Sequence, residues 1–146
     1  MNAVNSVRAD EQQEMEAGVI AVDPLPLIGR WINTNTATPG IARVTVASRG
    51  DDLTIRISSA NGPTPREWGD APIDVVYANG VGSQTAMALV AAYDFGYLET
   101  RVEANLSLGL LVVATFNTFK DGSPRSNYFG REFFYRADEL GEEHAA

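Results

Sequence analysis

Cysteine is absent from this sequence of 146 residues, and histidine occurs once, as His144 in an acidic stretch close to the end. Without thiols there is neither a disulfide framework nor a cysteine nucleophile. A zinc site is not expected, because such sites are built from several histidine and cysteine side chains. A calcium loop is not expected either, because Asp51 and Asp52 stand without further acids clustered around a glycine turn.

Three further features are missing. No apolar run approaches the roughly 20 residues of a membrane-spanning helix, and no charged start followed by an apolar stretch marks a secretory signal. No glycine-rich phosphate loop of the P-loop or dinucleotide-binding kind is present. These absences exclude most hydrolases, kinases and dehydrogenases. They predict a cytoplasmic protein without a membrane span, metal or cofactor, which binds a ligand or catalyses with carboxylates, tyrosines and arginines alone.

Positive charge is also in short supply. The formal net charge is −8, from 19 acidic and 11 basic residues. Residues 1–26 hold five acids and one base, and residues 137–146 hold four acids and no base, whereas the segment between them is balanced. Nucleic acid is not an expected partner, because its recognition needs clustered Lys and Arg and both acidic ends would repel phosphate.

The two acidic ends flank a single predicted domain at 27–136. In the segment 1–26, residues 10–17 are the one helix-prone stretch, and their thin apolar face leaves both a helix and disorder open. The prolines that follow form a stiff linker. We hypothesise that this segment folds over the domain as a lid. The tail at 137–146, which has a short helix-prone stretch of its own, cannot extend a sheet.

Short alternating segments fill the domain. In one of them Leu53, Ile55 and Ile57 alternate with polar side chains, which is the period of a half-buried strand. Turn residues such as those of 49–52 separate the segments, and no long amphipathic helix lies between them. The predicted strands are 27–34, 41–48, 53–59, 73–77, 85–95, 97–106, 110–119 and 127–136.

These strands predict an all-β fold. Nearly every connection is short, so strands adjacent in sequence are expected to pair in space as an antiparallel up-and-down meander. Closure into an eight-stranded β-barrel would remove the free edges and leave room inside for one small ligand. A two-sheet sandwich could use the same strands, but it usually needs Greek-key crossovers longer than these loops.

The first predicted strand opens with Gly29-Arg30-Trp31, followed by Asn33. This Gly-x-Trp resembles the start of the calycin barrels, the lipocalins and avidins. The resemblance covers the architecture of residues 27–136 and implies that Trp31 packs across the floor of a barrel. It also implies an arginine near the last strand, for which Arg131 is the match. No ligand is carried over from these families.

Two other resemblances are less local. The pieces at 63–65 with 68–69, and at 122–123 with 125–129, resemble a bacterial family of unknown function. By architecture alone, the chain is similar to the cofactor-free cyclases of polyketide pathways and to allene oxide cyclases.

The connection that contains 66–70 is the longest in the predicted domain, and long loops in compact domains tend to be functional. Arg66 is a candidate for holding an anionic or carbonyl group of a ligand, and Trp68 for covering the barrel mouth. The alternative is that Trp68 plugs the barrel end and Glu67 pairs with Arg66. The polar stretch that starts at Asn33 offers hydrogen bonds to a ligand or simply turns the chain.

Tyr93 lies on the apolar face of its strand, so its phenol is expected inside the barrel, bonded to a ligand carbonyl or to a neighbouring strand. Either face of the last strand brings an ionisable residue inward, because one face carries Arg131 and the other Glu132 and Arg136. A buried charge needs a partner or a ligand. An inward glutamate in apolar surroundings would be a candidate acid, and a structural ion pair is the alternative.

We therefore predict a barrel that holds one small, largely apolar or amphipathic molecule in its lumen. An alternative is a cofactor-free cyclase or isomerase that uses Tyr93 and Glu132. A third interpretation is a barrel filled by its own side chains, with partners outside, and a homodimer is left open. The candidate ligand-binding residues are Trp31, Asn33, Arg66, Trp68, Tyr93, Phe116, Asn117, Tyr128, Arg131 and Phe133.

Overall fold

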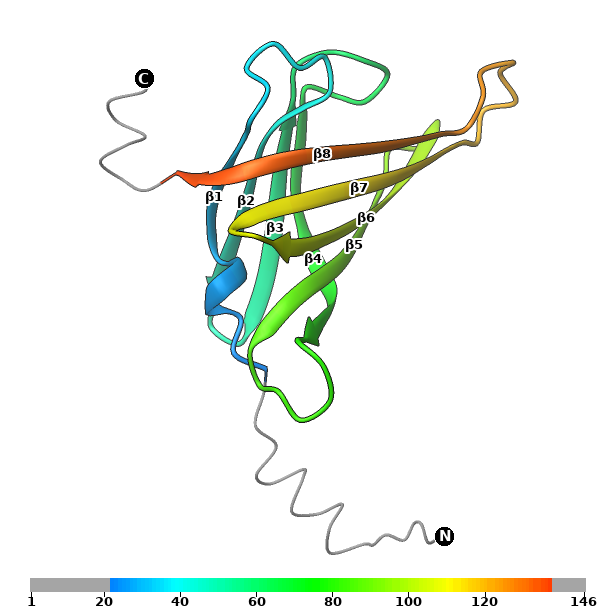
Figure 1. Cartoon of the computed structure of the whole chain (residues 1–146). Helices are drawn as coiled ribbons and strands as arrows, with labels where there is room; N and C mark the ends of the chain where they lie inside the picture. Colours follow the sequence, from blue (N-terminus) through cyan, green and yellow to red (C-terminus); the bar gives the residue numbers. More distant parts are fainter. Residues whose placement is uncertain (1–21, 138–146) are drawn as a thin grey trace, which may run out of the picture.

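The computed structural model describes residues 22–137 (Figure 1). The hypothesised lid and the acidic tail lie outside the described residues, apart from the linker and the residue Ala137. The elements are the 3-10 turn η1 (Leu25–Leu27) and the strands β1 (Gly29–Asn33), β2 (Ile41–Arg49), β3 (Asp52–Ser59), β4 (Glu67–Ala78), β5 (Ala86–Asp94), β6 (Leu98–Ser107), β7 (Leu110–Phe119) and β8 (Tyr128–Ala137).

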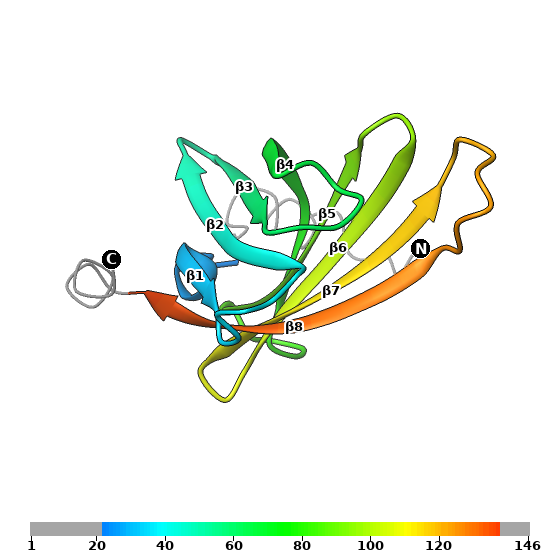
Figure 2. The same cartoon turned by 90° about the horizontal axis from the view of Figure 1, so that it is seen from above.

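The strands form one closed sheet. Each pairs antiparallel with the next along the chain, and β1 pairs with β8, where Trp31 lies opposite Arg136. The view from above shows the strands circling a common centre (Figure 2). The predicted all-β, eight-stranded, up-and-down barrel is confirmed, and the sandwich is not formed. Closure pairs the outer edges of β1 and β8 and so removes a template for uncontrolled strand addition.

The segment 66–70 is not a long loop, which corrects the sequence-based expectation. The strand β4 begins at Glu67, and Asp70 lies opposite Arg56 on β3. Two features accompany the strand in this stretch, whose residues have a poor strand-forming tendency. A register shift at the start of the β3–β4 ladder accommodates Gly69, whose φ is +84°. An ion pair of 2.8 Å between Arg56 and Asp70 crosses the two strands and lowers the pKa of Asp70.

The interior is packed with apolar side chains from the inward face of every strand. Alternation along each strand puts one set of residues inside, as the period of two requires. The fully buried residues with the largest side chains are Trp31, Phe134, Leu27, Ile55, Ile57, Leu89, Leu98 and Leu111.

One end of the barrel is closed by η1 and Trp31. The buried indole nitrogen of Trp31 donates a hydrogen bond of 3.0 Å to the carbonyl of Leu27. The guanidinium of Arg136 lies 4.4 Å from the centre of the Trp31 ring and donates to the carbonyls of Pro26 and Ile28. Trp31, Arg136 and the η1 backbone are called the seam cluster below, because they join the first and last strands.

The resemblance to lipocalins implied Arg131 as the arginine near the last strand. In the structure, the arginine that lies beside Trp31 is Arg136. Side chains on β8 alternate between faces, and Phe134, which is fully buried, fixes Glu132 and Arg136 on the inward side. Arg131 lies on the outer face, where its guanidinium is 4.9 Å from the ring centre of Phe133.

Phe116, expected among the lumen contacts, instead points outward, and the face of β8 that the sequence left open is now assigned, with the candidates Arg131 and Phe133 on the outer face. Phe116 and Phe133 are partly exposed on the outer face, and Phe116 packs against Phe129 with ring centres 5.2 Å apart. The cause is the register of β7 and β8. Thr115 and Asn117, which alternate with Phe116, are buried, so Phe116 must point away from the interior.

Gly29 supports the seam cluster in a way that another residue would not. Its φ is +143°, and a Cβ at this position would lie 2.5 Å from the Arg136 guanidinium. Gly69 has a φ of +84° and no atom within 4 Å of its added Cβ. We expect Gly69→Ala to cost about 1–2 kcal/mol of unfolding free energy from backbone strain. Gly29→Ala should cost about 1 kcal/mol more, because it also displaces hydrogen bonds of Arg136.

Urea unfolding followed by circular dichroism measures both costs. In an Arg136→Ala background, the cost of Gly29→Ala should be smaller by about 1 kcal/mol than in the wild type, because there is no guanidinium left to displace. An equal cost of Gly29→Ala in the two backgrounds would contradict a close contact between Gly29 and Arg136.

Candidate functional site

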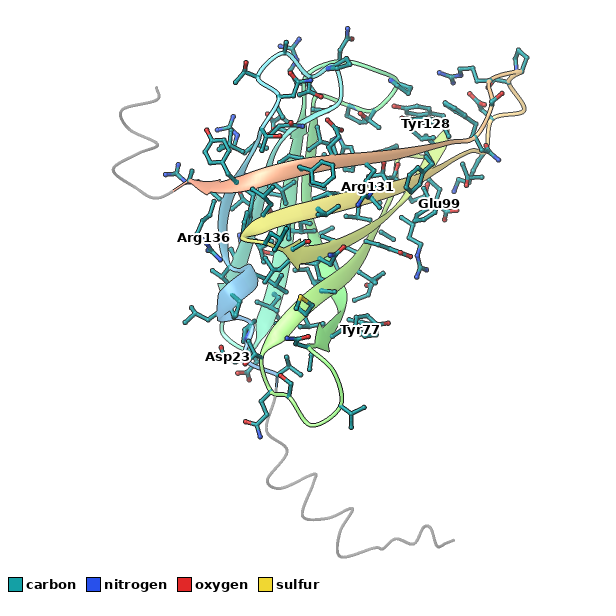
Figure 3. The ribbon with its side chains drawn as sticks, in the orientation of Figure 1. Asp23, Tyr77, Glu99, Tyr128, Arg131 and Arg136 are labelled. Atoms are coloured by element: carbon teal, nitrogen blue, oxygen red, sulfur yellow. The ribbon has the colours of Figure 1, made fainter. Side chains whose placement is uncertain are left out.

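A cavity of about 250 Å³ is lined by the β1–β2 and β3–β4 connections, which lie at the end of the barrel opposite η1 (Figure 1). The connection after β1 and the connection between β3 and β4 form its rim, and the inward faces of β7 and β8 form its wall. Figure 3 shows Tyr128 at the beginning of β8, near the β7–β8 turn, and Arg136 at the other end of the same strand, near η1. The lining residues used below are Gly40, Trp68, Thr115, Asn117, Tyr128, Gly130 and Glu132.

A carboxylate stands at the rim of this cavity. Oε1 of Glu132 accepts hydrogen bonds from the Asn33 amide at 2.7 Å and the Thr38 hydroxyl at 2.6 Å, and Oε2 accepts one from the Ile41 amide nitrogen at 3.0 Å. Gly40 makes this arrangement possible, because any Cβ there would collide with Oε2. The last strand thereby holds the connection between β1 and β2 across the mouth.

Asn117 is the hub of a second polar group on the wall. Its side-chain oxygen accepts a hydrogen bond of 2.7 Å from the Thr100 hydroxyl. Its amide nitrogen donates to the Thr115 hydroxyl at 3.1 Å and to the Tyr128 carbonyl at 3.2 Å. Asn117, Thr100 and Thr115 are all buried. Because every polar atom of the amide has a partner, the group is rigid and presents Thr115 to the cavity.

Trp68 forms the aromatic floor of the cavity. Its ring packs edge-on against Tyr93 at 5.1 Å and Phe95 at 5.4 Å between centres. Its indole nitrogen donates to the Ser59 hydroxyl at 3.3 Å, and Ser59 donates in turn to the Pro65 carbonyl at 2.7 Å. The indole is therefore fixed in plane by both packing and hydrogen bonding, and it lines the cavity without filling it.

Tyr93 lies beneath Trp68 and does not line the cavity. Its single hydroxyl proton is shared between the carbonyls of Ile55, at 2.9 Å, and Gly69, at 3.0 Å. The sequence left open whether the phenol binds a ligand carbonyl or a neighbouring strand, and in the structure it binds backbone carbonyls of β3 and β4. Burial raises the pKa of the Tyr93 phenol well above its ordinary value, and the negative charge of Asp70 raises it further.

The structure brings together about half of the residues expected at a site. Trp68, Asn117 and Tyr128 line the cavity, and Asn33 reaches it through Glu132. Trp31 lies at the opposite end of the barrel, in the seam cluster. Arg66 is exposed. Phe116, Arg131 and Phe133 are on the outer surface, as described above.

Sequence reasoning missed the small residues that make the cavity. Gly40 leaves room for Glu132, and Gly130 leaves an opening beside Thr115, whose hydroxyl would be 2.9 Å from a Cβ at position 130. The available signal was a glycine on the otherwise large inward face of the last strand. The rim residues Gly62 and Pro63 were also treated only as part of a connection.

A second hollow, of about 500 Å³, lies outside the barrel between the β2–β3 turn and β4. It is acidic, with Asp51, Asp52, Asp70 and Asp74 among its lining residues. Over residues 22–137, no group of three or more His, Cys, Asp or Glu side chains is placed to hold a metal ion. Arg49 and Arg56 both pair with Asp70, so the hollow is a charged surface feature.

Comparison with known proteins finds no matching family model, no similar curated protein and no similar solved structure. In the part of the chain that the structure covers, no helix has the length and apolar character needed to cross a membrane. The function is therefore argued from the geometry of the cavity.

The buried phenol of Tyr93 predicts a pH dependence of stability. Its pKa is raised in the folded protein, so the unfolded chain releases this proton first as the pH rises. The stabilisation is complete below about pH 10 and is lost above it, by up to about 1.4 kcal/mol per pH unit. We expect Tyr93→Phe to flatten the fall of unfolding free energy between pH 10 and 11, measured by urea unfolding.

The control for this measurement is the same comparison between about pH 7 and pH 9, where the Tyr93 phenol keeps its proton in both the folded and the unfolded protein. There the difference in unfolding free energy between the wild type and Tyr93→Phe should stay constant. A wild-type slope in Tyr93→Phe would mean that the buried phenol does not carry the effect.

Proposed function

We propose that this protein binds one small, largely apolar molecule in the cavity at the open end of its barrel. The observation that carries the proposal is the cavity itself, about 250 Å³ between the rings of Trp68 and Tyr128, with Asn117, Thr115 and Glu132 converging on it. Apolar walls with a few fixed polar groups are the general form of a small-molecule site. The volume lies just below the usual range of about 300–1,000 Å³ for such sites and suits a ligand of fragment size.

Packing favours the mouth over the centre of the lumen as the binding position. Trp31, Phe134 and Leu89 are at most 1% exposed and occupy the interior. A ligand there would have to displace side chains from a close-packed core, at a cost of several kcal/mol. At the mouth, in contrast, the cavity is already open between described residues.

Binding is favoured over the alternative of a cofactor-free cyclase or isomerase. That reaction was expected to use Tyr93 and Glu132 together, and only Glu132 lines the cavity. The Tyr93 hydroxyl is engaged by two backbone carbonyls, and its raised pKa makes it a weaker acid near neutral pH. Tyr93 therefore does not supply a second proton-transfer group to the cavity.

A nuclear magnetic resonance titration tests the proposal, with 2-naphthylmethanol as a neutral, mostly apolar probe. We expect the indole N–H signal of Trp68 and the side-chain amide signals of Asn117 to shift on binding. The indole of Trp31, buried at the opposite end, should not shift, and it provides an internal control because the chain has two tryptophans.

A variant that fills the cavity sharpens this test. Thr115→Ala removes the hydroxyl that would clash with a side chain at position 130, and Gly130→Leu then projects a side chain into the space. The double variant should lose most of the probe affinity, by about tenfold or more. The single variant Thr115→Ala is the matched reference, so the ratio of the two affinities measures the effect of the side chain at position 130 alone. Equal affinity in the two variants would place the probe elsewhere.

A further inference from the structure

The carboxylate of Glu132 has no cationic partner among residues 22–137. Its three hydrogen bonds come from neutral donors, the Asn33 amide, the Thr38 hydroxyl and the Ile41 backbone. The ion pairs in this part of the chain lie elsewhere, on the outer surface and in the turns, such as Arg56 with Asp70. Glu132 is thus an inward-facing anion, about half-buried, held in place without charge neutralisation.

The hydrogen-bond inventory of this carboxylate is incomplete. An ionised carboxylate has roughly four acceptor positions. Oε1 accepts two hydrogen bonds and Oε2 accepts one, from Ile41. The remaining position is therefore on Oε2, beside Gly40, and both residues line the cavity. A partly desolvated anion with a free acceptor position favours a ligand that brings a hydrogen-bond donor, and a positively charged one most of all.

The other walls agree with this requirement. No Lys or Arg is among the residues that line the cavity, so nothing in the wall competes for the carboxylate or repels a cation. Trp68 and Tyr128 contribute aromatic rings, and aromatic faces attract cations through their quadrupole. The Asn117 group and Thr115 are neutral. The cavity as a whole is an apolar, aromatic space with a single negative charge at its rim.

We propose that the ligand carries a protonated nitrogen, as in a small aryl- or alkylamine, and that this ammonium group donates to Oε2 of Glu132 while its apolar body contacts Trp68 and Tyr128. This inference rests on the proposed function and adds the chemical class of the ligand. It also makes Glu132 a ligand-binding residue, in addition to its role in holding the connection between β1 and β2.

Three probes of nearly equal shape test the inference: 2-naphthylmethylamine, 2-naphthylmethanol and 2-naphthoate, which are cationic, neutral and anionic at pH 7. Dissociation constants come from the titration of the Trp68 and Asn117 signals. We expect the amine to bind on the order of tenfold more tightly than the alcohol, and the carboxylate to bind most weakly. Added salt should weaken binding of the amine and leave that of the alcohol nearly unchanged.

Two substitutions separate the charge of Glu132 from its structural role. Glu132→Gln keeps the shape, removes the charge and loses the hydrogen-bond acceptor on one side, because its NH2 group only donates, so the affinity for the amine should fall to about that for the alcohol. Thr38→Val removes a neutral donor to the carboxylate and keeps the charge, so the preference for the amine should persist. The unshifted Trp31 indole signal reports that both variants retain the fold.

The outcomes distinguish the inference from the function on which it rests. Amine preference that disappears in Glu132→Gln and persists in Thr38→Val supports both. Equal binding of amine and alcohol, with shifts at Trp68, overturns the inference and leaves the cavity as a binding site whose carboxylate only ties the mouth together. Tighter binding of the naphthoate also overturns it. If no probe shifts the Trp68 or Asn117 signals, the proposed function fails as well.

Discussion

The pairing of β1 with β8 is the constraint on which the rest of the molecule depends. These strands are far apart in sequence, so their contact closes the longest loop in the domain and has a large entropic cost. The seam cluster offsets that cost locally. The Trp31 indole is buried and bonded to the carbonyl of Leu27, and Arg136 covers its ring while binding the carbonyls of Pro26 and Ile28. A packed ring, a cation and three hydrogen bonds thus join the two ends of the domain.

Closure also determines where chemistry can occur. With the sheet closed, every inward position of the eight strands faces the same small interior, and the apolar majority fills it. The polar inward residues Asn33, Thr115, Asn117 and Glu132 lie toward one end, where the connections between strands leave the cavity. They are mutually hydrogen-bonded or bonded to backbone, so the polar mouth is stable beside an apolar core. The filled centre and the open mouth are two consequences of one alternating pattern.

The sequence predicted the architecture well because architecture depends on features that repeat. Period-two alternation and turn residues recur in most of the eight strands, and the Gly-x-Trp marks the first of them. Details failed where one strand is apolar on both faces or where a tertiary contact overrides a local signal. In β7, Val112 and Phe116 point outward although they are as apolar as the inward Leu111, so hydrophobicity alone could not assign the faces. In β4, the backbone pairs with β3 through a stretch that resembles a loop, so the ladder between the two strands overrides the local signal.

The candidate site was only partly predictable for a related reason. Asn117, Tyr128 and Trp68 are conspicuous in the sequence, because polar or aromatic residues at inward positions attract notice. A cavity, however, depends on the absence of side chains. The glycines at positions 40 and 130 have no side chain, and nothing else in the sequence indicates the space that they leave. Large residues alternate on both faces of β8, so the sequence could not show which face points inward. The burial of Phe134 and the contacts of Glu132 assign that face.

One contact at the mouth has a mechanical consequence for the whole domain. The hydrogen bond between Asn33 and Glu132 joins residues 99 positions apart, at the far end of the same junction that Trp31 and Arg136 fasten. Side-chain contacts therefore join β1 and β8 at both ends of β1. A ligand bound to Glu132 would stabilise the contact between Glu132 and Asn33. Ligand binding at the mouth should then also increase the free energy needed to separate β1 from β8.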